Sequence, residues 1–402
     1  MSDKQWIKPY HRAVRNLVFA VLAPYTRLKY GVKPERFAAQ GDRPYLILYN
    51  HQTPFDQFFV GMSFRGAVYY LATEDIFSLG FISSVLRHLV APIPIKKQTT
   101  DIAAVRACMR VAREGGTIAL APEGNRTYSG KTEYINPAIA SLAKKLGLPI
   151  ALYRIEGGYG VQPRWSDKVR RGHMRAYVSR VIEPTEYAAM TPAELLREIK
   201  AGLYVNEASP SGEYRSRRRA EYMERALYVC PFCGLSRFES RGNVTECMSC
   251  HRKVEYGADK RLRGVGFDLP FEYFNDWYEY QNDFVRKLEL ARYMDTPMFT
   301  DTARLSEVEV YKRKHLLRSS AVLKLYGDRV TVDGGTEREL LFSFDEVTAM
   351  SVLGRNKLNI YHADRVYQIK GDRRFNALKY VNIYYCHKNI NKGDDNGKFL
   401  GL

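Results

Sequence analysis

The chain of 402 residues is long enough for two or three domains with cores of their own. It carries 62 Lys and Arg against 44 Asp and Glu, and its formal net charge of +18 points to an anionic partner: a phospholipid surface, a phosphorylated substrate or nucleic acid. The start of the chain lacks the pattern of a cleavable signal peptide, and the apolar runs at 17–25 and 76–95 are too short or too often interrupted to cross a bilayer. We therefore expect a cytoplasmic protein that meets a membrane, if at all, from one side.

Residues 1–40 combine basic and apolar side chains. Eight Lys and Arg residues stand against Asp3 and Glu35, and an aliphatic stretch from Leu17 to Leu22 lies between them. Buried apolar area and attraction to anionic lipid add in an interfacial helix, so this composition fits a helix that lies on a membrane surface. It fits equally well a helix that simply packs on the next domain.

Residues 41–205 alternate between short apolar runs and amphipathic stretches. Strands are predicted over 45–50, 67–72, 117–121, 149–155 and 174–182, and helices over 56–64, 101–114 and 137–146, with a further helix from Thr191. This rhythm predicts an α/β fold: a mainly parallel sheet wrapped by helices, with the active-site loops at the strand ends.

The first polar motif follows the first strand. His51 ends the apolar run, and Asp56, five positions later, can fold back to one imidazole nitrogen and leave the other to act as a base. No Ser or Cys nucleophile accompanies the pair locally, so the attacking hydroxyl is expected to belong to a substrate. The alternative is structural: Thr53 and Asp56, with Pro54 at the first helical position, also fit a helix cap.

The second polar motif, Pro122-Glu123-Gly124-Asn125-Arg126-Thr127, follows the strand at 117–121. Gly124 permits a backbone turn closed to other residues, and Arg126 offers a planar fork of donors matched to a phosphate. Arg126 taken alone would be a solvated surface arginine. In this order and at this separation, the two motifs resemble those of the glycerolipid acyltransferase superfamily, whose best-known members are the 1-acylglycerol-3-phosphate acyltransferases. The resemblance covers roughly residues 40–200.

The resemblance implies a reaction and a role for each residue. His51 would be the general base on the acceptor hydroxyl, Asp56 would orient it, and Glu123, Gly124 and Arg126 would hold the glycerol phosphate. A fatty acyl group would pass from a thioester, acyl-CoA or acyl carrier protein, to a lysophospholipid, with 1-acylglycerol-3-phosphate giving phosphatidate. Two alternatives remain: an inactive protein of this fold that binds lipid or serves as a scaffold, and an acyltransferase for another acceptor.

Two departures from the family pattern bear on the acceptor. After Ile93-Pro94-Ile95 the family usually has an acid and an arginine, whereas this chain has Lys96 and Lys97. Two lysines bind a phosphate as point charges, without the bidentate geometry of arginine. The apolar strand at 148–153 also lacks the family's second proline. These differences leave the identity of the acceptor undecided, whereas the expected acyl transfer reaction stays the same.

Two cysteine pairs follow a basic linker. Cys230 and Cys233, then Cys247 and Cys250, are CxxC pairs with 13 residues between them, a spacing that predicts a tetrahedral zinc site of ribbon type. Four thiolates fill the coordination shell, so the Zn²⁺ is expected to be structural, and a reducing compartment disfavours disulfides. The loops lack an evident row of basic and aromatic residues, and nucleic acid is not expected as a partner.

The last third of the chain changes from an aromatic helical stretch at 271–295 to period-two patterns after residue 318 and a final helix from about Arg374 to His387. Several antiparallel strands followed by one helix are similar to a pleckstrin-homology-like barrel. The expected parts are a basic amphipathic segment (1–40), an acyltransferase domain (41–205), a basic linker (206–227), a zinc ribbon (228–258), an aromatic helical connector (259–317), a pleckstrin-homology-like β domain (318–389) and a polar tail (390–402).

Overall fold

The computed structural model divides into two compact units. The first contains Met1–Pro163 and Val169–Tyr214, and the second contains Arg164–Lys168 and Arg215–Leu402. The structure describes residues 5–73, 77, 81–95, 101–207, 212–308 and 314–392, so Lys96 and Lys97 lie outside the described residues.

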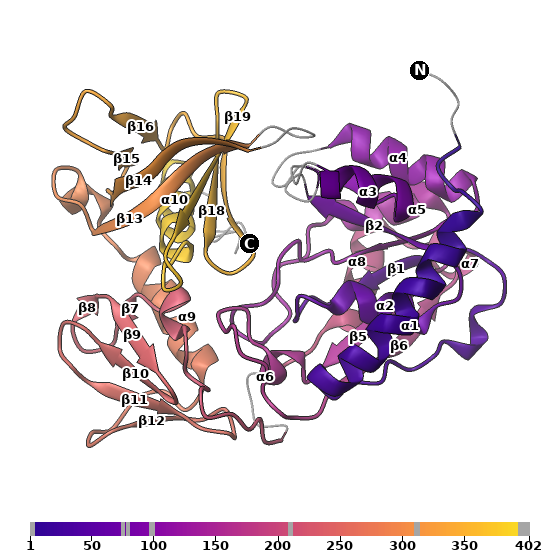
Figure 1. The fold of residues 1–402 in the computed structure, drawn as a ribbon, viewed down its shortest axis with the longest axis horizontal. Coiled ribbons are helices and arrows are strands. Elements are labelled where there is room, and N and C mark those ends of the chain that lie inside the picture. The colour runs from indigo at the N-terminus through magenta and orange to yellow at the C-terminus, as the bar shows by residue number, and fades with distance from the viewer. Residues whose placement is uncertain are drawn as a thin grey trace. The chain divides into compact units, whose positions relative to one another are not determined.

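The first unit is built on one six-stranded sheet (Figure 1). In chain order its elements are α1 (Tyr10–Tyr30), β1 (Leu46–Tyr49), α2 (Asp56–Ser63), β2 (Val68–Thr73), α3 (Phe81–Leu89), β3 (Ile93–Ile95), α4 (Ile102–Arg113), β4 (Thr117–Leu120), α5 (Ala138–Leu146), β5 (Ile150–Glu156), α6 (Gly158–Val161), β6 (Arg175–Ile182), α7 (Pro184–Ala188) and α8 (Pro192–Leu203). The strand order is β3-β2-β4-β1-β5-β6, and only the edge strand β6 runs antiparallel to its neighbour. The predicted α/β fold with a mainly parallel sheet is confirmed.

Alternation along the strands gives this sheet two cores, one on each face. Leu46 and Leu48 of β1 belong to the core that holds the buried faces of α4, α5 and α8, whereas Ile47 belongs to the core formed with α2. All three side chains are fully buried. Full burial of such a side chain contributes about 1.5–3 kcal/mol, so a four-residue strand is held firmly between two helical layers. The end of β1 is therefore a rigid place for a functional side chain.

Helix α1 packs on the first unit with one face and exposes the other. On the inner face, a Cβ atom at Gly61 of α2 would lie 2.4 Å from the Phe19 ring, so the two helices touch closely. On the outer face, apolar side chains at helical spacing are exposed to solvent: Tyr10 (44%), Leu17 (72%), Val21 (66%) and Leu28 (88%). We call these four residues the α1 stripe. The inner face thus packs on the domain, as one of the two interpretations expects, and the interfacial role of the outer face stays a prediction.

No helix within the described ranges is both long enough and apolar enough to span a bilayer.

In the part of the second unit that the structure describes, the strands form three sheets and are accompanied by two long helices (Figure 1). Its elements are β7 (Val229–Cys230), β8 (Gly234–Leu235), β9 (Phe238–Arg241), β10 (Val244–Cys247), β11 (Lys253–Tyr256), β12 (Leu262–Gly264), α9 (Phe274–Arg286), β13 (Phe299–Val308), β14 (His315–Leu325), β15 (Arg329–Val332), β16 (Leu340–Ser343), β17 (Ala349–Leu353), β18 (Lys357–His362), β19 (Arg365–Gly371) and α10 (Leu378–Lys392). The strand β7 pairs with β8, and β12-β11-β10-β9 form a four-stranded antiparallel sheet. Helix α9 contacts the β7 strand: the Trp277 indole N–H donates to the Val229 carbonyl (2.8 Å).

The C-terminal sheet has seven antiparallel strands in the order β16-β15-β14-β13-β19-β18-β17. Helix α10 follows it and is joined to β13 through Asp301, which receives the Tyr380 hydroxyl (2.7 Å) and pairs with the buried Lys379 ammonium (2.6 Å). The predicted antiparallel domain with a terminal helix is present. Its relation to pleckstrin-homology-like barrels stays a prediction.

Residues 164–168 belong to the second unit, although the sequence places them within the first domain. Asp167 accepts two hydrogen bonds from the buried Arg225 guanidinium (2.7 and 3.1 Å) and one from Arg355 (2.8 Å). The Arg164 guanidinium donates to the Val352 carbonyl (3.1 Å). Burial raises the pKa of Asp167, but the two arginines outweigh it, so the pKa lies below its usual value.

Candidate active site and metal centre

His51 and Asp56 meet at the carboxyl end of β1. The imidazole Nδ1 lies 2.7 Å from Asp56 Oδ2, and the His51 side chain is 22% exposed while Asp56 is fully buried. A carboxylate at Nδ1 selects the tautomer with the proton on that nitrogen, so Nε2 is the nitrogen that would take a proton from a substrate. The pairing that the five-residue spacing predicts is therefore formed.

Asp56 also organises the turn between β1 and α2. Its carboxylate accepts hydrogen bonds from the Gln52 amide (2.6 Å), the Thr53 amide (3.0 Å) and the Thr53 hydroxyl (2.6 Å). It is the first residue of α2, and these bonds run back into the turn that carries His51. Phe55 is the N-cap of α2 and no side chain caps the helix, so the predicted cap with Pro54 at the first helical position is not formed. The Asp56 carboxylate holds the turn instead, and its catalytic role stays a prediction.

Glu123 fixes the backbone of His51. One carboxylate oxygen accepts from the His51 amide (2.9 Å) and the other from the Glu133 amide (2.8 Å), while the His51 carbonyl accepts from the Thr127 amide (3.0 Å). Burial raises the pKa of Glu123 to about 8, although the two amide donors lower it. Both backbone groups of His51 are thus held by the second motif. This geometry favours a positioning role for Glu123, whereas the sequence predicts direct binding of the acceptor.

Two further buried side chains hold the same turn, and sequence reasoning missed their roles. The Asn50 amide group pairs with both backbone groups of Ile155 on β5 (2.7 and 2.8 Å), and Gln52 Oε1 accepts from the Tyr159 amide (2.9 Å). Their partners lie 105 and 107 positions away in the sequence, so no local pattern indicates them. Glu123 thus holds the His51 backbone, and Asn50 and Gln52 hold the positions directly before and after it.

Gly124 and Arg126 lie beside the clamp that Glu123 forms. Gly124 has a left-handed φ of 70°, which confirms the need for glycine at this turn. Arg126 is only 8% exposed, so it is not a solvated surface arginine. The direct role of either residue toward an acceptor stays a prediction, as does that of Lys96 and Lys97.

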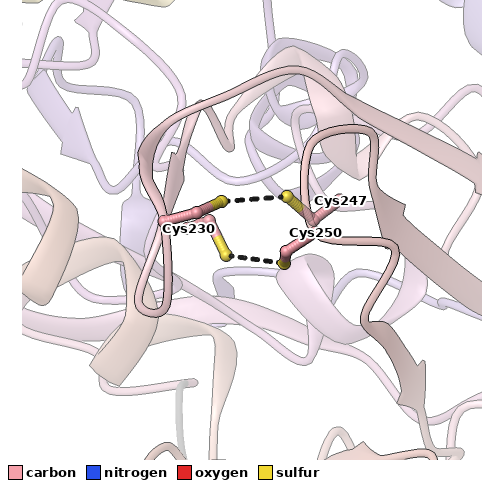
Figure 2. A group of neighbouring side chains, drawn as sticks. Cys230, Cys247 and Cys250 are labelled. Atoms are coloured by element: carbon pink, nitrogen blue, oxygen red, sulfur yellow. Dashed lines mark hydrogen bonds between the residues drawn. The ribbon is translucent and has the colours of Figure 1, made fainter.

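The four predicted zinc ligands converge in the second unit. The Sγ atoms of Cys230, Cys233, Cys247 and Cys250 all lie within 4.8 Å of one another, from two loops that face each other (Figure 2). Cys230 and Cys250 are 3.7 Å apart, and Cys233 and Cys247 are 3.5 Å apart. Four thiolates around a tetrahedral zinc ion with Zn–S bonds of about 2.3 Å stand about 3.8 Å from each other, so the cluster fits this ion. These separations are far too long for disulfides.

A hydroxyl supports one of the sulfur atoms. Ser236 Oγ lies 3.1 Å from Cys247 Sγ and 2.9 Å from Ser249 Oγ. The single Ser236 hydroxyl proton can also go to the Arg237 carbonyl (3.1 Å). When it is donated to the sulfur instead, it would stabilise a thiolate and fix its direction, as outer partners of metal ligands do. Ser236 lies between the two cysteine pairs, where the spacing rule for zinc ligands gives no information on it.

A test of the positioning role separates kcat from KM. Glu123→Gln places an amide donor against a backbone donor and breaks one of the two clamps, so we expect kcat to fall about tenfold while KM for the acceptor stays nearly constant. Steady-state kinetics of acyl transfer measure both. Glu35→Gln, at an acid that is 54% exposed on the same unit, is the control. A raised KM with unchanged kcat would instead assign Glu123 to acceptor binding.

Part of the first unit is similar to known acyltransferases. Residues 32–155 match the acyltransferase family model. A chloroplastic 1-acyl-sn-glycerol-3-phosphate acyltransferase of Brassica napus is 20% identical over 178 residues, which cover 44% of this chain and 51% of the relative. An Arabidopsis thaliana protein of the same description is 20% identical over 183 residues, covering 43% and 50%.

The chain thus spans about half the length of these curated relatives. Among solved structures, the 1-acyl-sn-glycerophosphate acyltransferase PlsC of Thermotoga maritima is similar with a TM-score of 0.39 and 17% identity, over 50% of this chain and 82% of that one. The match to the acyltransferase family model at 32–155 lies within the first unit, and the two plant relatives are acyltransferases by description.

Proposed function

We propose that this protein moves a fatty acyl group from a thioester to the hydroxyl of a lysophospholipid. The observation that carries the proposal is the contact between His51 Nδ1 and Asp56 Oδ2 at a strand end whose backbone is clamped by Glu123. An intact pair of this kind argues against an inactive scaffold. The names of the plant relatives suggest 1-acylglycerol-3-phosphate as acceptor and phosphatidate as product.

His51 would act as general base and then as general acid. Its Nε2 takes the proton of the acceptor hydroxyl as the oxygen attacks the thioester carbonyl, and the buried Asp56 carboxylate stabilises the imidazolium. The C–S bond then breaks, and the thiolate of the donor leaves with the proton from Nε2. The ester oxygen comes from the acceptor, the acyl carbon from the donor, and no acyl-enzyme forms.

The polar end of the acceptor would lie against the second motif. Arg126 supplies a guanidinium fork matched to a phosphate, and Gly124 keeps the approach to its backbone open. Lys96 or Lys97 would add a point charge. Glu123 would act through the His51 backbone rather than on the acceptor.

The four cysteines would hold a structural Zn²⁺. The charge and number of the thiolates suit zinc and leave no coordination position for a substrate, so the ion would contribute folding free energy to the second unit. Ser236 would stabilise the Cys247 thiolate. The ribbon and the C-terminal sheet would then form an accessory unit that needs the metal for its fold.

The α1 stripe would bring the protein to the membrane that holds its acceptor. Exposed apolar residues on one helix face insert at the lipid interface, and the exposed Arg12, Arg27 and Lys29 would attract anionic headgroups. We expect Leu17→Ser, Val21→Ser and Leu28→Ser together to weaken binding to phospholipid vesicles roughly tenfold or more. Vesicle sedimentation measures this loss.

A matched control separates α1 from general surface hydrophobicity. Ile102→Ser with Tyr204→Ser removes apolar side chains that are 61% and 52% exposed elsewhere on the first unit. This variant should bind vesicles like the wild type. Equal loss in both variants would contradict the assignment of α1 as the interfacial helix.

Acceptor selectivity tests the proposed function. The purified protein is given one labelled acyl thioester, on coenzyme A or on acyl carrier protein, together with lysophosphatidate, glycerol 3-phosphate or lysophosphatidylcholine in separate reactions. We expect transfer to lysophosphatidate to be fastest. Faster transfer to an acceptor without a phosphate monoester would contradict the proposed role of Arg126.

A further inference from the structure

Among the residues that the structure describes, the outward positions of the central strands of the C-terminal sheet carry cations and no acid. Because β13 positions alternate, Ala303 and Leu305 point into the core, while Thr302, Arg304 and Ser306 point outward. The register extends this outer face to the neighbouring strands, which lie beside β13 in Figure 1. The outward-pointing positions that are exposed or half-buried on β13, β14, β18 and β19 are Thr300, Thr302, Arg304, Ser306, Leu316, Val322, Lys324, Lys357, Tyr361, Val366 and Lys370. Asn359 and Gln368 point the same way but are buried (3% and 6% exposed).

Three cations stand directly opposite one another across three strands. Arg304 pairs in register with Lys370, and Lys370 pairs with Lys357. Like charges in opposite positions of adjacent strands destabilise a sheet. Two more cations flank this row: Lys324, opposite Thr300, and Lys314, whose ammonium donates to Gln368 (2.9 Å). We call Arg304, Lys314, Lys324, Lys357 and Lys370 the cationic face.

The most exposed of these cations lack an acidic partner. Arg304 and Lys370 are exposed, and neither forms an ion pair with an acid among the residues that the structure describes. By contrast, Arg365 on β19, which points to the other side, pairs with Glu307 (3.6 Å). The adjacent charges of Arg304 and Lys370 therefore repel each other unless an external anion lies on them.

The same face also exposes aliphatic side chains. Leu316 is 53% exposed opposite Ser306, and Val322 is 42% exposed opposite Thr302. Cations set among exposed aliphatics complement a surface that offers both negative headgroups and hydrocarbon. A single-stranded nucleic acid would call for exposed aromatic rings on which bases stack, and only the half-buried Tyr361 stands at the outward positions named above.

We propose that the cationic face docks on an anionic phospholipid surface. The choice of a membrane rests on the proposed function, since a lysophospholipid acceptor is itself held in such a surface. The proposal adds a second lipid contact, made by the second unit and independent of the α1 stripe. It also gives the C-terminal sheet a role that the transfer chemistry does not need.

The test compares two variants that lose the same charge. Arg304→Gln with Lys370→Gln removes the centre of the cationic face, and Arg241→Gln with Arg292→Gln removes two arginines whose side chains are 86% and 72% exposed elsewhere on the second unit. The full chain is sedimented with phosphatidylcholine vesicles, with and without phosphatidylglycerol. Each cation near an anionic surface is worth about fivefold in binding, so we expect about 25-fold weaker binding for the first variant and less than about twofold for the second.

Three results would overturn the proposal: equal losses in both variants, no loss in the first, or release of the wild type from vesicles by free glycerol 3-phosphate, which would assign the face to a small phosphate. Acyl transfer is assayed in parallel on detergent-dispersed lysophosphatidate, where docking is not required. The Arg304 and Lys370 variant should keep the wild-type rate there. An inactive wild type that still shows the charge-specific vesicle binding would refute the proposed function and leave the docking surface standing.

Discussion

His51→Ala is expected to lower kcat for acyl transfer about 10²- to 10⁴-fold, because the acceptor hydroxyl loses the base that takes its proton. The side chain is partly exposed, and its bond to Asp56 is one of several that this carboxylate accepts, so the fold should persist. Steady-state rates with a labelled acyl thioester measure the effect, and thermal unfolding checks the fold. Loss of rate without loss of stability would assign the effect to chemistry.

His173→Ala is the matched control for this variant. His173 is an exposed histidine of the first unit, at the start of the segment that leads into β6. Its replacement should leave kcat unchanged. If His51→Ala transferred acyl groups as fast as His173→Ala, proton removal by His51 would be excluded and the proposed mechanism would be wrong.

Cys247→Ser is expected to abolish metal binding and to unfold the ribbon within the second unit. Cys247 is 2% exposed, and its sulfur lies near both Cys233 and Ser236. Structural zinc contributes an apparent 10–16 kcal/mol in zinc-finger peptides, a free energy larger than that of most whole domains. Elemental analysis should find one zinc per wild-type chain and far less in the variant, together with a lower Tm.

Cys108→Ala and Cys386→Ala control for the loss of a buried thiol. Both cysteines are buried, Cys108 on α4 and Cys386 on α10, and neither belongs to the cluster. They should retain one zinc per chain. A wild type without zinc after purification in zinc-containing buffer, or a Cys247→Ser variant of unchanged Tm, would contradict a structural metal.

The pairing of His51 with Asp56 could be predicted because the information is local. An apolar run places His51 at a strand end, and five residues of turn bring a carboxylate back to it. The mainly parallel sheet could be predicted, since βα alternation favours parallel strands whose carboxyl ends share one edge. The convergence of the four cysteines followed from two spacings, for the same local reason.

The features that could not be predicted from the sequence depend on partners far away along the chain. Glu123 looks like a substrate ligand by resemblance, yet its direction is set by amides at His51 and Glu133. Asn50 finds its partner on β5 only once the sheet has formed. The placement of residues 164–168 in the second unit depends on Arg225 and on a strand nearly two hundred residues away, which no local pattern encodes.

The most direct test of the proposed reaction is to follow a labelled acyl group from the thioester into phosphatidate. Purified protein is mixed with a thioester of a labelled long-chain acyl group, carried by coenzyme A or acyl carrier protein, and with lysophosphatidate in mixed micelles, and the lipids are separated. We expect label in phosphatidate, formed in proportion to protein with at least one carrier and absent with His51→Ala. Label that stays in the thioester, or appears only as free fatty acid with both carriers, would contradict the proposed reaction.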